Sequence, residues 1–136
     1  MGFGSGDSCS DRFMSRDHQK LRVFHIADAL VTDIYHATKD FPPEERYGLQ
    51  AQIRRAAVSV ASNLVEGSAR RGQQEYLNFC NIACGSAFET RYLAELAFRL
   101  NMLSSKTHQD IVPRLTVLCK SLVRMVLALE GPKPKT

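Results

Sequence analysis

Four segments of the chain carry hydrophobic residues at intervals of three and four positions, which is the spacing of one face of an α-helix. They run from about residue 18 to 39, from 42 to 66, from 73 to 100, and from a start between 105 and 108 to about 130. No stretch of useful length alternates between polar and apolar residues, so no strand is expected. Because the connecting segments are short, neighbouring helices should run antiparallel. We therefore predict an all-α chain folded as an antiparallel up-and-down four-helix bundle.

Prolines, a glycine and capping residues mark where these helices should begin and end. Pro42 and Pro43 end the first helix and can open the second, since proline disfavours helical geometry in the residue before it and suits a first helical position. Gly67 is expected to end the second helix as a left-handed cap, and Asn101 to end the third. The fourth helix can be capped by any of three hydroxyl residues, Ser104, Ser105 or Thr107.

The ends of the chain differ in composition from the middle. Residues 1–15 are rich in Gly, Ser and Asp, which predicts a disordered N-terminal tail. Residues 16–131 form the predicted bundle domain, and residues 132–136 a basic C-terminal tail.

The second helix carries a polar stripe beside its core stripe of Leu49, Ile53, Ala56, Ala57, Val60 and Leu64. A helical wheel places these polar residues where they would border the core, and buried polar groups need hydrogen-bond partners. With two residues of the third helix they can form a binding site or a hydrogen-bonded network that fixes helix register, and we favour the network. The residues concerned are Gln52, Arg55, Ser59, Asn63, Glu66, Ser86 and Glu89.

Apolar residues also lie outside the core stripes of the second and third helices. A helix that is apolar on both sides is usually buried on both sides, and for a chain of 136 residues the simplest second partner is another copy. Scattered apolar surface residues are the alternative. The expected oligomer interface consists of Val58, Val65, Leu77, Cys84 and Phe88.

Charge is unevenly distributed over a chain of formal net charge +4 and pI near 9.0. Residues 104–136 carry six basic and two acidic side chains, the largest positive excess in the chain. On the fourth helix four cations share one arc, with no acidic residue expected between them, and the Arg70-Arg71 connector adds two more. These residues form a phosphate-contacting surface or simply a solvated face. The candidate nucleic-acid contacts are Arg70, Arg71, Lys106, Arg114, Lys120 and Arg124.

No catalytic or cofactor site is legible in the sequence. The histidines are scattered, and the glycines at 67 and 72 are not followed by the Lys-Ser/Thr of a phosphate-binding loop. Cys80 and Cys84 are one helical turn apart, but no histidine in the same segment completes a metal site. No segment approaches the roughly 20 apolar residues of a membrane span. We expect a cytoplasmic, non-enzymatic protein without metal, cofactor or membrane partner.

The region from Phe41 to Leu103 resembles a known bacterial family. It reads FPPEERYGLQAQIRRAAVSVASNLVEGSARR, followed by EYLNFCNIACGSAFETRYLAELAFRLNML. This resembles the four-helix bundle family of 23S ribosomal RNA intervening-sequence proteins. The most specific pieces are Phe41-Pro42, Glu45, Gln52, Arg54-Arg55-Ala56, Ser59, Asn63, Glu66-Gly67, Gly85-Ser86 and Glu89. Cys84 departs from the pattern, which favours a basic or other polar residue before Gly85-Ser86.

The resemblance implies an assembly and a set of partners that the residue pattern alone does not give. A related group, the accessory proteins of diversity-generating retroelements, forms basic pentameric barrels that associate with a reverse transcriptase and nucleic acid. By this resemblance we expect a ring-shaped homo-oligomer, a pentamer, with RNA or DNA and a reverse transcriptase or other protein as possible partners. The alternatives are a protein-interaction scaffold or accessory subunit and, distantly, an unrecognised enzyme.

Overall fold

The computed structural model describes residues 18–132, with side chains described from residue 22 onward. Four α-helices make up this part of the chain, α2 (His18–Thr38), α3 (Leu49–Ser68), α4 (Gln73–Arg99) and α5 (Ser105–Glu130), together with the short 3-10 helix η2 (Pro43–Glu45). No strand occurs among the described residues, which confirms the all-helical prediction. The predicted N-terminal tail (1–15) lies outside the described residues, as do residues 133–136 of the predicted C-terminal tail (132–136).

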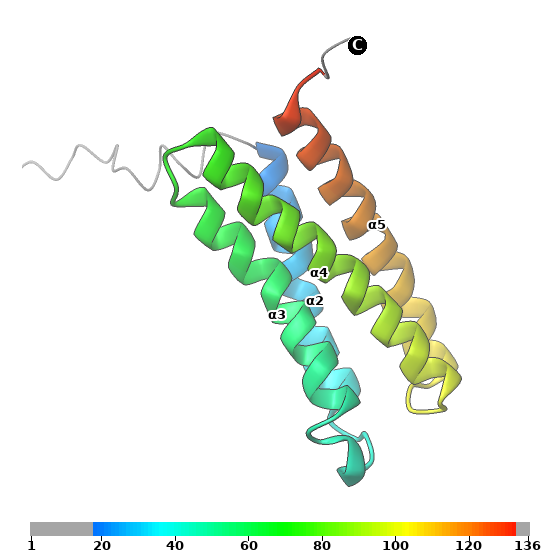
Figure 1. Cartoon of the computed structure of the whole chain (residues 1–136). Helices are drawn as coiled ribbons and strands as arrows, with labels where there is room; N and C mark the ends of the chain where they lie inside the picture. Colours follow the sequence, from blue (N-terminus) through cyan, green and yellow to red (C-terminus); the bar gives the residue numbers. More distant parts are fainter. Residues whose placement is uncertain (1–17, 133–136) are drawn as a thin grey trace, which may run out of the picture.

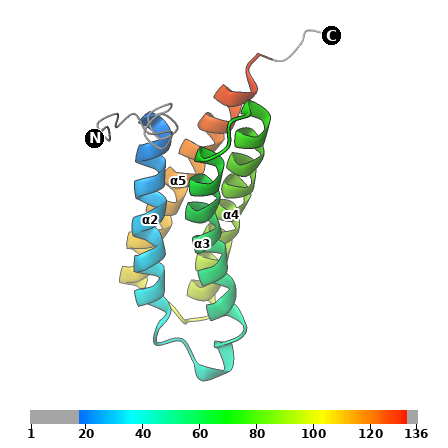
Figure 2. The ribbon, with the colours of Figure 1, turned by 90° about the vertical axis from the view of Figure 1, so that its left-hand side faces the viewer.

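The helices form an up-and-down bundle in which each packs against its neighbours in the chain and α5 closes onto α2 (Figures 1 and 2). The α3–α4 contact is the most extensive and the α2–α5 contact the least. Four alanines of α4 are buried in the bundle, and small side chains at a helix contact let two helices approach closely. These residues are Ala83, Ala87, Ala94 and Ala97, all fully buried. No helix within residues 18–132 is both long and apolar enough to cross a membrane.

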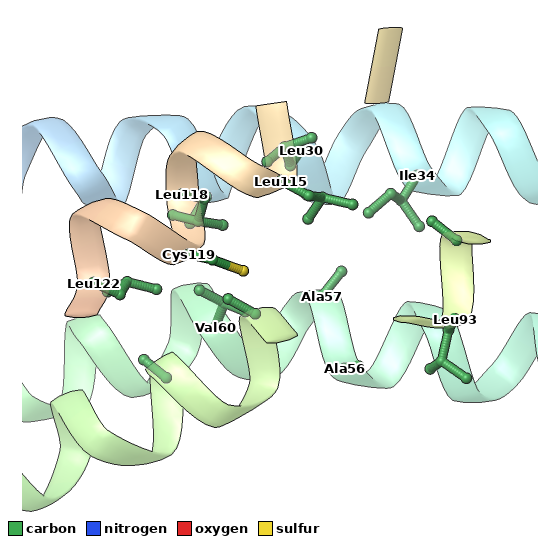
Figure 3. Packing of buried hydrophobic residues seen from close by; sticks show 14 of the residues in the cluster. Leu30, Ile34, Ala56, Ala57, Val60, Leu93, Leu115, Leu118, Cys119 and Leu122 are labelled. Carbon is green, nitrogen blue, oxygen red and sulfur yellow. The ribbon is translucent and has the colours of Figure 1, made fainter. Parts of the chain in front are cut away.

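The core lies along the bundle axis and draws on all four helices (Figure 3). Leu30 and Ile34 of α2 face Val60 of α3 and Leu115 of α5, each about 1% exposed. Burial of one such aliphatic side chain contributes about 1.5–3 kcal/mol. All six residues of the predicted α3 core stripe are buried, so the wheel located this face correctly.

Two helix ends differ from the sequence prediction. The prolines open η2 rather than α3, which begins six residues after Pro43 at Leu49. The Glu45 carboxylate accepts a hydrogen bond from the Leu49 N–H at 2.9 Å, so a side chain of η2 caps α3. Gly67 does not end α3, which continues through Ser68 with Ala69 as its C-cap. An added Cβ on Gly67 would lie 2.9 Å from the Phe79 Cβ, so this glycine permits close α3–α4 packing.

The α4–α5 turn follows the prediction. Asn101 has φ 63°, the left-handed conformation that ends a helix. Ser104 caps α5, accepting a hydrogen bond from the Thr107 N–H at 3.1 Å. Pro113 lies within α5 and lacks the N–H for one hydrogen bond of the helix, an interruption that was not predicted from the sequence.

Candidate nucleic-acid interface

The side of α5 that faces away from the core carries exposed cations. Lys106, Lys120 and Arg124 are exposed, and none forms an ion pair with another described residue. Lys106 and Arg124 are 18 residues apart in one helix, about 27 Å at 1.5 Å per residue. We call these three residues the outer face of α5. They form a line of free positive charge rather than a pocket.

Arg114 was predicted to belong to the same group but is engaged in ion pairs. Its guanidinium lies 2.6 Å from the Asp33 carboxylate on α2 and 3.2 Å from that of Asp110, one turn earlier on α5. The expectation that no acidic residue shares the arc was therefore wrong, because Asp110 lies on it. Arg114 links α5 to α2, so a phosphate would have to compete with two carboxylates.

The α3–α4 connector places its two arginines in different environments. Arg70 pairs with Glu66 at 3.3 Å, and its guanidinium lies 5.0 Å from the Phe79 ring centroid. Arg71 is exposed and has no ion pair with another described residue. The connector lies at the end of the bundle where α5 finishes, whereas α5 begins at the opposite end (Figure 1). The six predicted cations therefore do not gather in one patch.

The predicted polar network is realised in part, between α3 and α4. The Ser59 and Ser86 hydroxyls are 2.8 Å apart, and the Asn63 amide donates to the carbonyl and hydroxyl oxygens of Ser59 at 2.8 and 3.0 Å. Thr90, fully buried, donates to the Ser86 carbonyl at 2.7 Å. The other predicted members lie elsewhere, with Glu66 on Arg70 and the exposed side chains of Gln52, Arg55 and Glu89 outside this network.

The predicted interface residues separate into exposed and buried groups. Val58, Val65 and Phe88 are 39%, 51% and 40% exposed, and Cys84 is half-buried. Leu77 was expected on the outer side of its helix, but it is 9% exposed and belongs to the core. A wheel of one isolated helix misplaced it, because such a wheel does not include the side chains of neighbouring helices that pack around Leu77 in the core. Leu77 therefore packs within its own chain and is not part of an exposed interface.

A further basic surface, which the sequence did not reveal, lies where α2 turns into α3. Two hollows of about 510 and 480 Å³ adjoin there and share Arg46, Gln50 and Arg54. We call this surface the α2–α3 corner. Its lining also includes Tyr35, Lys39, Phe41, Pro42, Pro43, Tyr47, Ala51, Arg55 and Val58.

Hydrogen bonds to the end of α2 hold the α2–α3 corner in shape. Arg54 donates from Nε to the Thr38 hydroxyl at 2.8 Å and from Nη2 to the Tyr35 carbonyl at 3.1 Å. Gln50 donates to the Thr38 carbonyl at 2.7 Å. The Tyr35 carbonyl belongs to the last turn of α2, whose carbonyls lack intrahelical partners, and a cation there also favours the helix dipole. Arg54 lies 4.5 Å from the Tyr35 ring centroid as well, so the guanidinium is fixed on three sides.

Comparison with known proteins places this fold in a family. Residues 19–124 match the family model for the 23S rRNA-intervening sequence protein. The chain belongs to this family. Among solved structures it is similar to a protein of unknown function from the S23 ribosomal protein family of Bacteroides thetaiotaomicron, with TM-score 0.72 and 23% identity over 79% of this chain and 97% of that one. At this identity the likeness shows the fold. No curated protein matches significantly.

The family match covers both candidate surfaces of the chain. Residues 19–124 include the α2–α3 corner, the α3–α4 polar network and the α5 cations through Arg124. Within the described part of this family member, no three His, Cys, Asp or Glu side chains gather as a metal site would require. Burial raises the pKa of the Cys84 thiol, and burial raises that of Cys119 despite the lowering effect of the Arg91 charge. Both cysteines are therefore neutral thiols rather than reactive thiolates at pH 7.

Proposed function

We propose that this protein is a non-enzymatic homo-oligomer that binds RNA through basic surfaces repeated in each subunit. The observation that carries the proposal is the outer face of α5, where Lys120 and Arg124 are exposed without an ion pair to any described residue. Such cations bind phosphate by displacing condensed counterions, with no need to break an existing contact. Arg71, exposed at the same end of the bundle, adds a third charge.

Two apolar patches on different flanks support assembly from identical subunits. Val65 is exposed on α3, two turns beyond Val58 on the same helix face and outside the hollow that Val58 lines with Tyr35, so the patch at Val65 lies on the α2 side of α3. Phe88 is exposed on a different helix, α4, where it lies 4.9 Å from the guanidinium of Arg91. Contact between two different patches is heterologous, and repeated heterologous contacts can close into a ring. The family resemblance favours a ring of five.

An exposed glycine within α4 supports a helix contact from outside the subunit. Gly85 lies in the middle of α4, and an added Cβ would meet nothing within 4 Å. Glycine at such a position costs about 1 kcal/mol relative to alanine, which calls for a compensating role. A neighbouring helix that packs on Phe88 would approach closely at Gly85.

A ring would repeat the α5 cations once per subunit, so weak contacts would add through multivalency. Phosphate contacts position a nucleic acid without reading its bases, and binding should therefore show little sequence selectivity.

Charge reversal tests the RNA-binding part of the proposal. The variant K120E/R124E should bind a labelled structured RNA at least ten-fold more weakly than wild type at low salt. The control R22E/R99E has the same net charge, since either pair of reversals takes the formal charge from +4 to zero. It should bind nearly as wild type does. Equal binding by wild type and K120E/R124E, or equal loss in both variants, would refute a specific role for α5.

Light scattering coupled to gel filtration tests the assembly. Wild type should have a mass several times 15.2 kDa. Val65→Glu should reduce that mass, whereas Val117→Glu on α5 should not, although Val65 and Val117 are similarly exposed, 51% and 53%. A monomeric wild-type protein at micromolar concentration would contradict the oligomer.

One observation favours a protein-interaction scaffold as a second candidate function. A groove of about 730 Å³ between α2 and α5 is lined mainly by apolar groups of Ile26, Ala29, Pro113 and Val117. An accessory subunit could receive an amphipathic segment of another protein, such as a reverse transcriptase, in such a groove. Salt-insensitive association with one protein, in place of salt-sensitive RNA binding, would favour this alternative.

A further inference from the structure

We infer that the α2–α3 corner binds unpaired nucleotides of RNA, with one base stacked on Tyr47 and the adjoining phosphates held by Arg46 and Arg55. This inference rests on the proposed RNA binding and adds to it a second site with its own ligand class. Cations that are separate from the outer face of α5 line this corner together with two tyrosine rings.

Tyr47 presents its ring to solvent to an unusual degree. The residue is 88% exposed, although tyrosine normally buries its aromatic body. The guanidinium of Arg46 lies 6.0 Å from the ring centroid, so a cation and an aromatic face stand side by side. Stacking on an exposed aromatic ring with arginine at the backbone is how proteins bind single strands without sequence preference.

The loop that carries Tyr47 is held at both ends. The Gly48 N–H donates to the Glu45 carbonyl at 3.0 Å, and the Glu45 carboxylate caps α3 at Leu49. A Cβ on Gly48 would lie 2.7 Å from that carboxylate, so the cap requires glycine here. The ring therefore projects from a fixed backbone, which lowers the entropy lost when a base stacks on it.

The charges around the corner favour an anion. Lys39, Arg46, Arg54 and Arg55 line the two hollows, and none of the lining residues is acidic. Arg55 is exposed and forms no ion pair with a described residue, whereas Arg54 is held by the end of α2. Asp40 and Glu44 are exposed and close to the corner in the chain, but neither lines one of the two hollows.

The ring and the hollow size together select unpaired RNA over a duplex. A hollow of about 510 Å³ is within the range of small-molecule sites and can receive a nucleotide. Bases in a duplex are stacked on one another, so Tyr47 can stack only on a base in a loop, bulge or single strand. An acidic peptide could use the arginines but would gain little from the exposed ring.

The test compares tyrosine variants on two RNA probes by fluorescence anisotropy. The probes are a labelled oligouridylate about twelve nucleotides long, within the site sizes of single-strand binders, and an RNA duplex of equal length. Tyr47→Ala should weaken oligouridylate binding on the order of ten-fold and leave duplex binding within about two-fold. Tyr47→Phe keeps the ring and should bind as wild type does. Tyr92→Ala is the matched control, because Tyr92 is 56% exposed with Arg99 at 5.9 Å but lies outside both hollows.

The remaining outcomes distinguish a failure of the corner site from a failure of the proposed RNA binding by α5. If K120E/R124E weakens binding while Tyr47→Ala matches wild type, the corner is not a nucleotide site and the α5 proposal stands. A wild type that binds neither probe overturns both. If Tyr47→Ala lowers the mass of the oligomer, the Tyr47 side chain forms a contact between subunits and this inference is wrong. If oligoglutamate displaces the RNA equally from wild type and Tyr47→Ala, the corner recognises charge alone and the stacking site is refuted.

Discussion

The α2–α3 corner and the outer face of α5 both present cations, but they hold them in different ways. At the corner Arg54 is bonded to a buried threonine and a helix-end carbonyl, and it lies over an aromatic ring. On α5, Lys120 and Arg124 form no ion pair with a described residue and project from a regular helix. The Arg54 charge at the corner is therefore part of the hydrogen bonding that joins α2 to α3, whereas the α5 cations have no such structural contacts with described residues.

This difference separates stability from binding. An arginine that is already fixed loses little further entropy when a ligand binds, and its removal should lower the free energy of unfolding. A free lysine loses rotamer freedom on binding, but its removal leaves the bundle unchanged. Mutation of Arg54 should therefore lower stability, whereas mutation of Lys120 or Arg124 should weaken RNA binding and leave stability unchanged.

The largest effect on stability is expected from Arg54→Ala. The change removes two hydrogen bonds to the end of α2, where Thr38 is 1% exposed, and should lower the free energy of unfolding by about 1–3 kcal/mol. Urea denaturation measures it. The control is the neighbouring Arg55→Ala, which is exposed and should change stability by less than about 0.5 kcal/mol. Equal effects of the two substitutions would show that the corner is not tied to the fold.

A smaller loss of stability is expected from Asn63→Ala. This substitution tests whether the α3–α4 polar network stabilises the fold as Arg54 does at the corner. Asn63 donates to Ser59, but Ser59 retains its contact with Ser86 at 2.8 Å, so no buried group is left unpaired. We expect a loss of about 1 kcal/mol in the free energy of unfolding. An unchanged melting temperature would mean that these polar contacts contribute nothing net.

The smallest effect on the fold is expected on α5. The double variant K120A/R124A should unfold within about 0.5 kcal/mol of wild type, because neither side chain has an ion pair to lose among the described residues. The same urea experiment measures it. A clear destabilisation would show that this face contacts another part of the assembly.

The two regions also differ in how well they could be predicted from the sequence. The α5 cations and the α3 core stripe were predicted because each belongs to one helix with a fixed period. The α2–α3 corner combines two helices and a loop, and Arg54 becomes meaningful only when Thr38 lies beside it, sixteen residues away in the chain. Residues 42–71 carry five basic and three acidic side chains, but nothing local in the sequence distinguishes Arg46 or Arg55 from other surface arginines.

The errors have the same origin in contacts between helices. The sequence predicts a helix end at Gly67, whereas the role of this glycine depends on Phe79 of the next helix. Leu77 appears exposed on an isolated wheel, but in the folded chain it is 9% exposed and belongs to the core. Arg114 appears free until Asp33 of α2 is brought to 2.6 Å. A single-helix pattern cannot supply any of these partners.

The salt dependence of RNA binding tests the central claim most directly. Wild type and K120A/R124A should each be titrated with the same labelled RNA over a series of salt concentrations. We predict that wild-type affinity falls steeply and linearly on logarithmic axes, and that the variant's slope is smaller by about 1 for each phosphate that it no longer neutralises. Wild-type binding that is absent at low salt, insensitive to salt, or equal in slope to the variant would contradict the proposal that the α5 cations bind RNA phosphates.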